Sequence, residues 1–168
     1  SIATSFGTPS SSNISGAAKS LVPSELVDDL EAVADALKSE GYGLTITSGL
    51  RSLEEQKRQI GLKCNNPPGS ATCDPKDGKT VACILRDNNP ANCPHTTGRA
   101  LDIWGTELGS TSQCVTQSQC DFRLGSNDPC RLNECQAALI TAMKAQGFCN
   151  LSSEAWHFEK PKMSGTCN

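Results

Sequence analysis

Ten cysteines in 168 residues constrain this chain more than any other feature of its sequence. They stand at positions 64, 73, 83, 93, 114, 120, 130, 135, 149 and 167. No two have C-x-x-C spacing, which argues against a zinc ribbon, a thioredoxin-like redox pair and an iron–sulfur ligand set. An even number at wider spacings indicates a disulfide framework formed in an oxidising compartment. Their pairing stays open, because ten cysteines allow roughly 945 connectivities.

The rest of the composition agrees with a cross-linked exported domain. Apolar residues make up 36% of the chain and aromatic residues 4%, which predicts a modest core. The net charge is −3 and no basic run occurs, so neither nucleic acid nor an anionic membrane surface is an expected partner. No apolar run approaches a membrane span, and the first residues lack signal-peptide character. We therefore expect a mature or trimmed monomer that is secreted, periplasmic or cell-wall associated.

Three stretches are predicted to form helices, the first from its apolar periodicity. They cover residues 24–41, residues 53–62 and a stretch from Asn133. Ser24 can cap the first helix and Gly41 can stop it. Ser52 and Glu55 form a capping-box pattern at the start of the second.

Four short stretches have the composition of strands: residues 43–48, 99–104, 148–152 and 155–159. Between them, residues 63–94 and 105–130 read as long irregular loops that need disulfides to order them. Helices mixed with short strands predict an α+β fold, a small, mainly antiparallel sheet with flanking helices and disulfide-rich loops. Residues 1–20, rich in Ser, Thr and Gly, read as a flexible leader before a single domain over residues 21–168.

The only two histidines, His95 and His157, each lie near a carboxylate. A catalytic zinc takes three protein ligands and keeps a fourth position for water. His95, Asp102 and His157 supply such a set, because Gly98 permits a tight turn between the first two. Asp102 alternates with apolar neighbours, so its carboxylate points away from the packed side of the strand. Glu154 would then be the general base.

Each of these residues also has a plain structural interpretation. A single loop histidine is usually a polar surface residue, and Trp104 and Trp156 are of a type that commonly packs in cores. Positions 154 and 157 face opposite sides of a regular strand, so both can reach one metal only if the chain bends near Ala155. The joint pattern is what favours a metal site.

The segments SGLRS (48–52), HTTGRALD (95–102) and EAWH (154–157) occur in the order of a known family pattern. Together they resemble the zinc D-alanyl-D-alanine carboxypeptidases of the vancomycin-resistance type, which belong with lysostaphin-like peptidases and the hedgehog signalling domain. The resemblance spans about residues 24–160. It implies a fold of that hedgehog and D-Ala-D-Ala peptidase kind.

The resemblance also implies an activity, which is zinc-dependent hydrolysis of the C-terminal D-alanine peptide bond in peptidoglycan stem peptides. It makes His95, Asp102 and His157 the ligands of one zinc ion. Glu154 would be the general base and then the general acid. The chain would be a metallopeptidase of the bacterial cell wall.

On the substrate side, the resemblance implies that Arg51 holds the terminal carboxylate or steadies the oxyanion, a task suited to a guanidinium. Gln56 and Trp156 are further expected substrate contacts. Two positions depart from the family pattern: Leu50 replaces a tyrosine, and Cys93 replaces a serine two places before the first histidine.

A metal-free, disulfide-rich extracellular structural domain is the alternative that the gathered motifs favour least, and two other functions remain open at this stage. One is a peptidoglycan endopeptidase of the same fold, a lysin-like enzyme that cuts inside the wall peptide. Such enzymes commonly carry Asp where this chain has Glu154, which favours the carboxypeptidase. The other is a non-catalytic zinc-bearing binding module, which the joint presence of Glu154 and Arg51 disfavours.

Overall fold

A computed structural model describes all 168 residues of the chain. The main helices are α1 (Val27–Ser39), α2 (Leu53–Lys63), α3 (Pro94–Thr97), α4 (Pro129–Leu132) and α5 (Glu134–Ala145). The strands are β1 (Phe6–Gly7), β2 (Ile14–Ser15), β3 (Val22–Pro23), β4 (Tyr42–Ser48), β5 (Ala100–Glu107), β6 (Cys149–Asn150) and β7 (His157–Glu159). Five strands form one sheet in the order β2-β4-β5-β7-β6, and only β2 pairs in parallel. The predicted α+β class with a small, mainly antiparallel sheet is confirmed.

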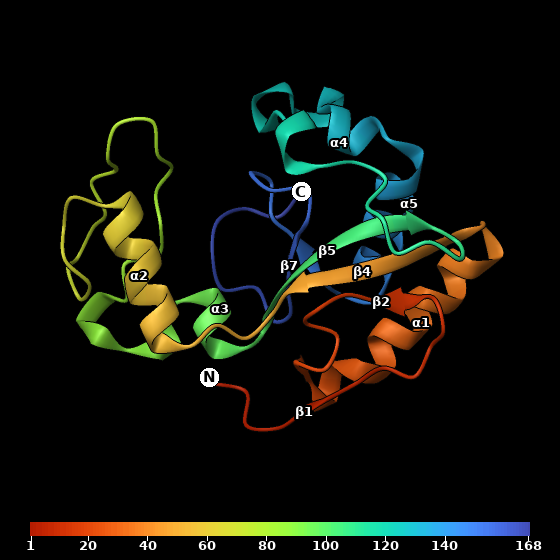
Figure 1. The fold of residues 1–168 in the computed structure, drawn as a ribbon, viewed down its shortest axis with the longest axis horizontal. Coiled ribbons are helices and arrows are strands. Elements are labelled where there is room, and N and C mark those ends of the chain that lie inside the picture. The colour runs from red at the N-terminus through yellow and green to blue at the C-terminus, as the bar shows by residue number, and fades with distance from the viewer.

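The core lies between this sheet and two helices. Helices α1 and α5 contact each other and pack against β4 and β5 (Figure 1). A cluster of 22 buried residues, including Leu37, Ile46, Ile103 and Phe158, fills that space. The apolar stripe predicted for the first helix is the face that enters this core. Burial of these side chains is the main force that holds the sheet in place.

Two of the predicted helix starts are confirmed and one differs. The Ser52 hydroxyl accepts a hydrogen bond from the Glu55 amide at 3.1 Å, and Asn133 caps α5 in the same way. Ser24 caps nothing: it begins a single 3-10 turn, Ser24–Leu26, that leads into α1 without a side-chain cap. The 3-10 turn allows Leu26 to enter the core before the helix proper begins.

The structure of residues 1–20 differs from the flexible leader expected from their composition. Strand β2 extends the sheet beside β4, and Ile14 and Ala18 belong to the main core. Gly16 has a φ of +112°, and a side chain there would collide with the backbone of Ile46. The small residues therefore allow the segment to lie close against β4, a contact that composition alone does not reveal.

Residues 50–97, here called the α2 lobe, stand to one side of the sheet (Figure 1). The lobe contains α2, the irregular loop over residues 64–93 and α3. Its own core is small and consists of Ile60, Cys64, Ile84, Leu85 and Cys93. Two disulfides, Cys64–Cys73 and Cys83–Cys93, cross-link it. The remaining residues, 1–49 and 98–168, are called the sheet body.

The other three disulfides lie in the sheet body. They are Cys114–Cys135, Cys120–Cys130 and Cys149–Cys167, and no cysteine is free. The predicted disulfide framework is therefore confirmed, which is the usual state of proteins from oxidising compartments. None of the helices combines the length and apolarity needed to cross a membrane.

Candidate functional site

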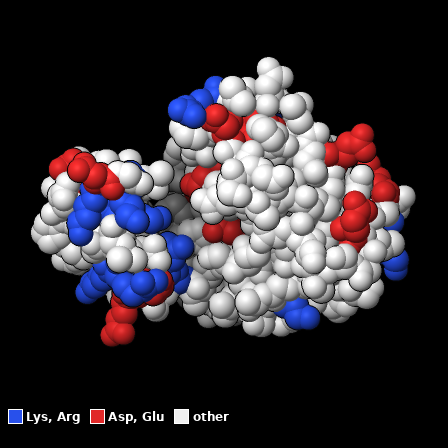
Figure 2. Space-filling model, turned by 45° about the horizontal axis from the view of Figure 1, so that its top comes forward, with Lys and Arg blue, Asp and Glu red and all other residues white.

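A cleft of about 740 Å³ separates the α2 lobe from the sheet body. It is visible in Figure 2 as a hollow between the smaller and the larger part of the molecule. The site residues singled out in the sequence all line it: Arg51, Gln56, His95, Asp102, Glu154, Trp156 and His157. Folding thus brings together side chains that are separated by up to about a hundred positions along the chain.

Two histidines and an aspartate meet at the bottom of this cleft. Asp102 Oδ1 lies 3.0 Å from His157 Nδ1 and 3.4 Å from His95 Nε2. Asp102 and His157 are direct cross-strand partners on β5 and β7, while His95 arrives from α3. One ligand atom from each residue lies within 4.8 Å of the other two. The three residues expected to bind a metal therefore form one cluster.

The local sequence explains how His95 returns to Asp102. Helix α3 is a single turn that begins with Pro94 and ends at Thr97, and it is capped by Gly98, whose φ of +78° is left-handed. A Cβ on Gly98 would come within 2.8 Å of the Phe6 ring, so glycine suits both the turn and the packing. The tight turn expected at Gly98 is present.

The hydrogen bonds of the two imidazoles fix which nitrogens face the cluster. His95 Nδ1 lies 2.9 Å from the Gly49 carbonyl, which can only accept, so His95 donates there and leaves Nε2 facing Asp102. His157 Nε2 lies 2.7 Å from a Glu159 carboxylate oxygen and leaves Nδ1 facing Asp102. An imidazole whose second nitrogen is held in this way has the arrangement seen in metal-ligating histidines.

Glu159 is a site residue that the sequence analysis missed. It is 1% exposed and accepts hydrogen bonds from the Met163 and Ser164 amides and from the Ser164 hydroxyl. Burial alone would raise the pKa of Glu159, but the hydrogen bond from His157 and those from Ser164 lower it to about 2. The alternation of His157, Phe158 and Glu159 along β7 was the available signal, since it places the first and third side chains on one face.

The charges of the cluster call for a cation. Asp102 Oδ1 and His157 Nδ1 are both acceptors when the imidazole is neutral, yet they lie 3.0 Å apart. Without a metal a proton fills the gap: burial would lower the pKa of His157, but hydrogen bonds to Asp102 and Glu159 raise it to about 10. Burial would likewise raise the pKa of Asp102, but hydrogen bonds from His157 and His95 hold it well below its usual range. This donor set, two nitrogens and a carboxylate oxygen, fits a divalent ion such as zinc.

Glu154 lies in the turn just before β7. The His157 amide donates to the Glu154 carbonyl at 3.1 Å, so the chain bends between them as the predicted site requires. Hydrogen bonds stabilise this bend: the Ala155 carbonyl accepts from the buried side-chain amides of Gln136 and Asn150, each at 3.1 Å. The Glu154 side chain lines the cleft. Burial raises the pKa of this carboxyl, an effect that the positive charge of His157 partly offsets.

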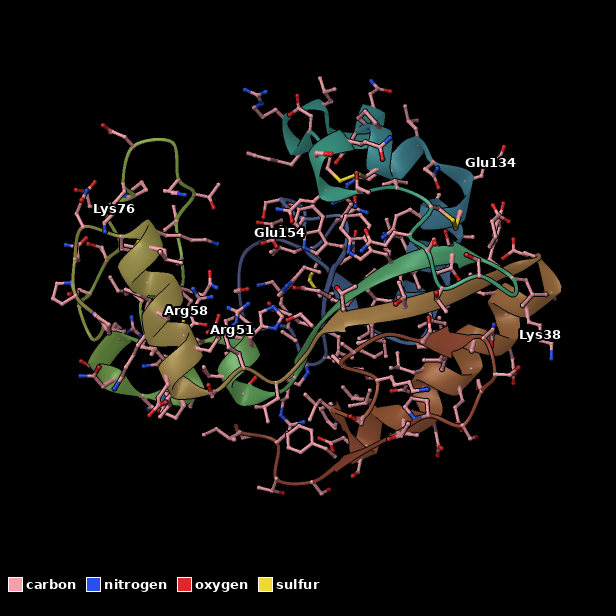
Figure 3. All side chains as sticks on the ribbon, viewed as in Figure 1. Lys38, Arg51, Arg58, Lys76, Glu134 and Glu154 are labelled. Atoms are coloured by element: carbon pink, nitrogen blue, oxygen red, sulfur yellow. A yellow bond between two sulfur atoms is a disulfide. The ribbon has the colours of Figure 1, made fainter.

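Arg51 faces this group from the other wall. Figure 3 shows Arg51 beside α2 and Glu154 on the sheet body across the cleft. The Arg51 amide donates to the His95 carbonyl at 2.9 Å, which ties the arginine to the metal cluster. Its guanidinium donates to Gln56 Oε1 at 2.9 Å, while Gln56 Nε2 donates to the Cys83 carbonyl at 2.7 Å. Gln56 therefore supports Arg51, and both ends of its amide are already engaged.

Trp156 and Cys93 also line the cleft. Trp156 is half-buried and stacks on the buried Trp104, with ring centroids 5.2 Å apart and planes inclined by 14°. One tryptophan thus serves the core and the other borders the cleft. Cys93 is fully buried in its disulfide with Cys83, so its side chain offers no hydroxyl-like contact at this position.

Comparisons with known proteins find likeness among solved structures only. No protein-family model matches the chain, and no curated protein matches it. Among solved structures, a chain described as "LdcB LD-carboxypeptidase", in work on "peptidoglycan recognition", is similar with 19% identity and a TM-score of 0.47. The match covers 82% of this chain and 58% of that one. This likeness concerns shape alone.

Proposed function

We propose that this protein is a zinc-dependent carboxypeptidase that hydrolyses the C-terminal D-alanine peptide bond of peptidoglycan stem peptides. The observation that carries the proposal is the convergence of His95, Asp102 and His157 at the floor of a cleft that Glu154 and Arg51 also line. The motifs shared with the D-alanyl-D-alanine carboxypeptidases supply the substrate class.

His95 Nε2, His157 Nδ1 and an Asp102 oxygen would hold the ion. Zinc, when bound, supplies Lewis-acid polarisation of the scissile carbonyl and lowers the pKa of its water. Glu159 keeps His157 in the tautomer that presents Nδ1, and the Gly49 carbonyl does the same for Nε2 of His95. The chain thus orients both imidazoles before any ion arrives.

Glu154 would transfer protons during the reaction. Burial raises the pKa of this carboxyl in the direction of the working pH. A general base accepts and returns a proton most efficiently when its pKa lies near that pH. It would take the proton from the attacking water and pass it to the leaving amine of D-alanine. The bend at Ala155 keeps this carboxylate on the same side of the chain as His157.

Arg51 would bind the substrate's terminal carboxylate. It forms no ion pair in the structure, so its charge is available to a ligand. A guanidinium can bind a carboxylate through two parallel hydrogen bonds, and Gln56 restrains this one from behind. Trp156 would supply an apolar wall. Such a substrate and five disulfides support a secreted, periplasmic or cell-wall setting for the protein.

The test is mass spectrometry of a stem pentapeptide incubated with the protein, with and without a chelator. Release of free D-alanine that stops on chelation is the expected result. The same peptide with its C-terminus amidated should be cut poorly, because Arg51 would have no carboxylate to bind. Equal cleavage of both, or cleavage at an internal bond, would instead identify the endopeptidase alternative.

A non-catalytic zinc module is the remaining alternative. If the protein is such a module, the stem peptide will bind but release no D-alanine, whether zinc is present or has been removed by a chelator. The position of Glu154 in the cleft argues against it, since a binding module has no use for a half-buried carboxylate that faces the metal cluster and forms no ion pair of its own.

A further inference from the structure

The two walls of the cleft carry opposite charges. Figure 2 shows Lys and Arg side chains gathered over the α2 lobe, with Asp and Glu side chains on the other side of the hollow. Within the cleft, the positive groups of the lobe wall are Arg51 and Lys63, and the negative groups of the facing wall are Asp102 and Glu154. The proposed mechanism gives a role to Arg51 but none to Lys63.

Lys63 belongs to one polar face of α2. Gln56, Gln59 and Lys63 line the cleft and follow one another at spacings of three and four residues, which puts them on one side of the helix. The Lys63 side chain is half-buried, at the last residue of α2. Arg51 stands at the opposite end, two positions before the helix starts. The cleft wall thus has a cation at each end and amides between them.

Lys63 has no carboxylate within ion-pairing distance, although its charge reaches Glu154 across the cleft. Four other cations of the chain do form ion pairs with carboxylates: Arg58 with Glu55, Arg99 with Glu25, Arg123 with Asp121, and Lys160 with Asp29. Lys63 forms neither an ion pair nor a side-chain hydrogen bond. A half-buried ammonium without a partner in a substrate cleft is a group that an anionic ligand can satisfy.

The separation of the two cations sets the length of that ligand. The Arg51 guanidinium lies against Gln56, seven residues before Lys63, so about 10 Å of helix at 1.5 Å per residue separates the two contact points. An extended peptide spans at most about 3.3–3.6 Å per residue, so roughly three to four residues match this distance. A peptide whose terminal carboxylate lies at Arg51 would bring a residue three or four positions upstream near Lys63.

We propose that Lys63 binds a second, free carboxylate of the substrate, three to four residues before the scissile end, and so selects acidic stem peptides over amidated ones. This inference rests on the proposed function, because the peptide's direction is set by Arg51 and the metal cluster. Lys63 is a specificity residue: it contacts the upstream part of the substrate and not the reacting atoms.

The experiment is isothermal titration calorimetry of the zinc-loaded Glu154→Gln variant, which binds without turning over. The probes are a stem pentapeptide whose γ-linked D-glutamate keeps its free α-carboxylate, and the same peptide with that carboxylate amidated. We expect roughly tenfold tighter binding of the acidic peptide, between the effect of an exposed ion pair and that of a charge-assisted hydrogen bond.

Adding Lys63→Met should make the two affinities equal. Lys57→Met is the matched control, since Lys57 lies on the same helix but is exposed and outside the cleft; it should keep the preference. Lys63 holds the neighbouring loop only through its backbone carbonyl, so the substitution leaves that contact intact. Equal binding of both peptides before the Lys63 change, a preference that survives it, or no binding of either peptide would overturn the inference.

Turnover by the unmodified protein separates this inference from the proposed function. A tenfold preference abolished by Lys63→Met, without release of D-alanine, would keep the inference and overturn the enzyme. Zinc-dependent release of D-alanine from both peptides at equal affinity would keep the enzyme and overturn the inference.

Discussion

The sheet body and the α2 lobe are stabilised in different ways. The body has a 22-residue core between its sheet and two long helices, while the lobe has an apolar core of only five residues and relies on two disulfides. Apolar burial holds the first, and cross-links that limit the unfolded chain hold much of the second. A segment of loops with a small core is thus able to form one wall of a cleft.

The candidate site draws on both regions. Asp102, Glu154 and His157 come from the body, whereas Arg51 and His95 come from the lobe. The body supplies the proposed base and two ligands on paired strands. The lobe supplies the third ligand and the positive charge for a carboxylate. The rate of the reaction should therefore depend on residues of the body. Assembly of the metal site should depend on the contacts and disulfides that stabilise the lobe.

The largest expected effect tests the body's part. Glu154→Gln should lower the rate of D-alanine release by about 10²–10⁴-fold, because the amide cannot accept the proton. Zinc content by elemental analysis should be unchanged, since Glu154 is not in the ligand set. The exposed Glu134→Gln is the matched control. Wild-type rates for Glu154→Gln would remove this residue from the mechanism.

A pair of core truncations tests whether the two regions unfold independently. Leu101→Ala in the body should lower the free energy of global unfolding by about 2–5 kcal/mol, as for other buried leucines. Ile60→Ala removes a fully buried side chain of the lobe, and its cost should appear as local opening of the lobe. Native-state hydrogen exchange distinguishes them. If Ile60→Ala reduces amide protection in β4 and β5 as much as Leu101→Ala does, the regions form one cooperative unit.

Removing one lobe disulfide tests the cross-link argument directly. The Cys83→Ala, Cys93→Ala double variant opens a loop with a sequence separation of 10, which costs about 3 kcal/mol by loop entropy. We expect faster exchange in the lobe and weaker zinc binding, because His95 lies two residues from Cys93. A matched double variant at Cys120 and Cys130, in the body, should keep zinc affinity. Loss of zinc affinity in both would contradict a lobe-specific effect.

The smallest expected effect concerns Glu159, which binds the second ring nitrogen of His157. Glu159→Gln should weaken zinc binding by about 10–100-fold, the usual consequence of losing a carboxylate that orients a ligating histidine. Competition with a chromogenic chelator measures this in the absence of substrate. Glu107→Gln, at the far end of β5, is a control on the neighbouring strand. An unchanged affinity for Glu159→Gln would show that His157 needs no such support.

The same contrast explains which features the sequence could predict. Local patterns were sufficient for α2 and its Ser52 cap, for the turn at Gly98, and for the strand that presents Asp102, because each depends on neighbours a few residues away. The grouping of His95, Asp102 and His157 was also predictable, since the motifs that contain them resemble a known family. Their roles remain proposals that the experiments above address.

What the sequence did not reveal depends on distant partners. Residues 1–20 pack because β4 offers an edge and Gly16 allows close approach, and neither fact is visible in a polar segment. Glu159 is important only because β7 turns it toward His157. Disulfide pairing follows from which loops meet in space, so spacing left it open.

The stacked indoles of Trp104 and Trp156 give this molecule a built-in optical probe. They are the only two tryptophans in the chain, and one of them borders the cleft while the other is sealed in the interior. A peptide lying against the outer ring changes its solvent contact and its electronic coupling to the inner ring. Near-ultraviolet circular dichroism and emission spectra should therefore follow occupancy of the cleft in unlabelled protein.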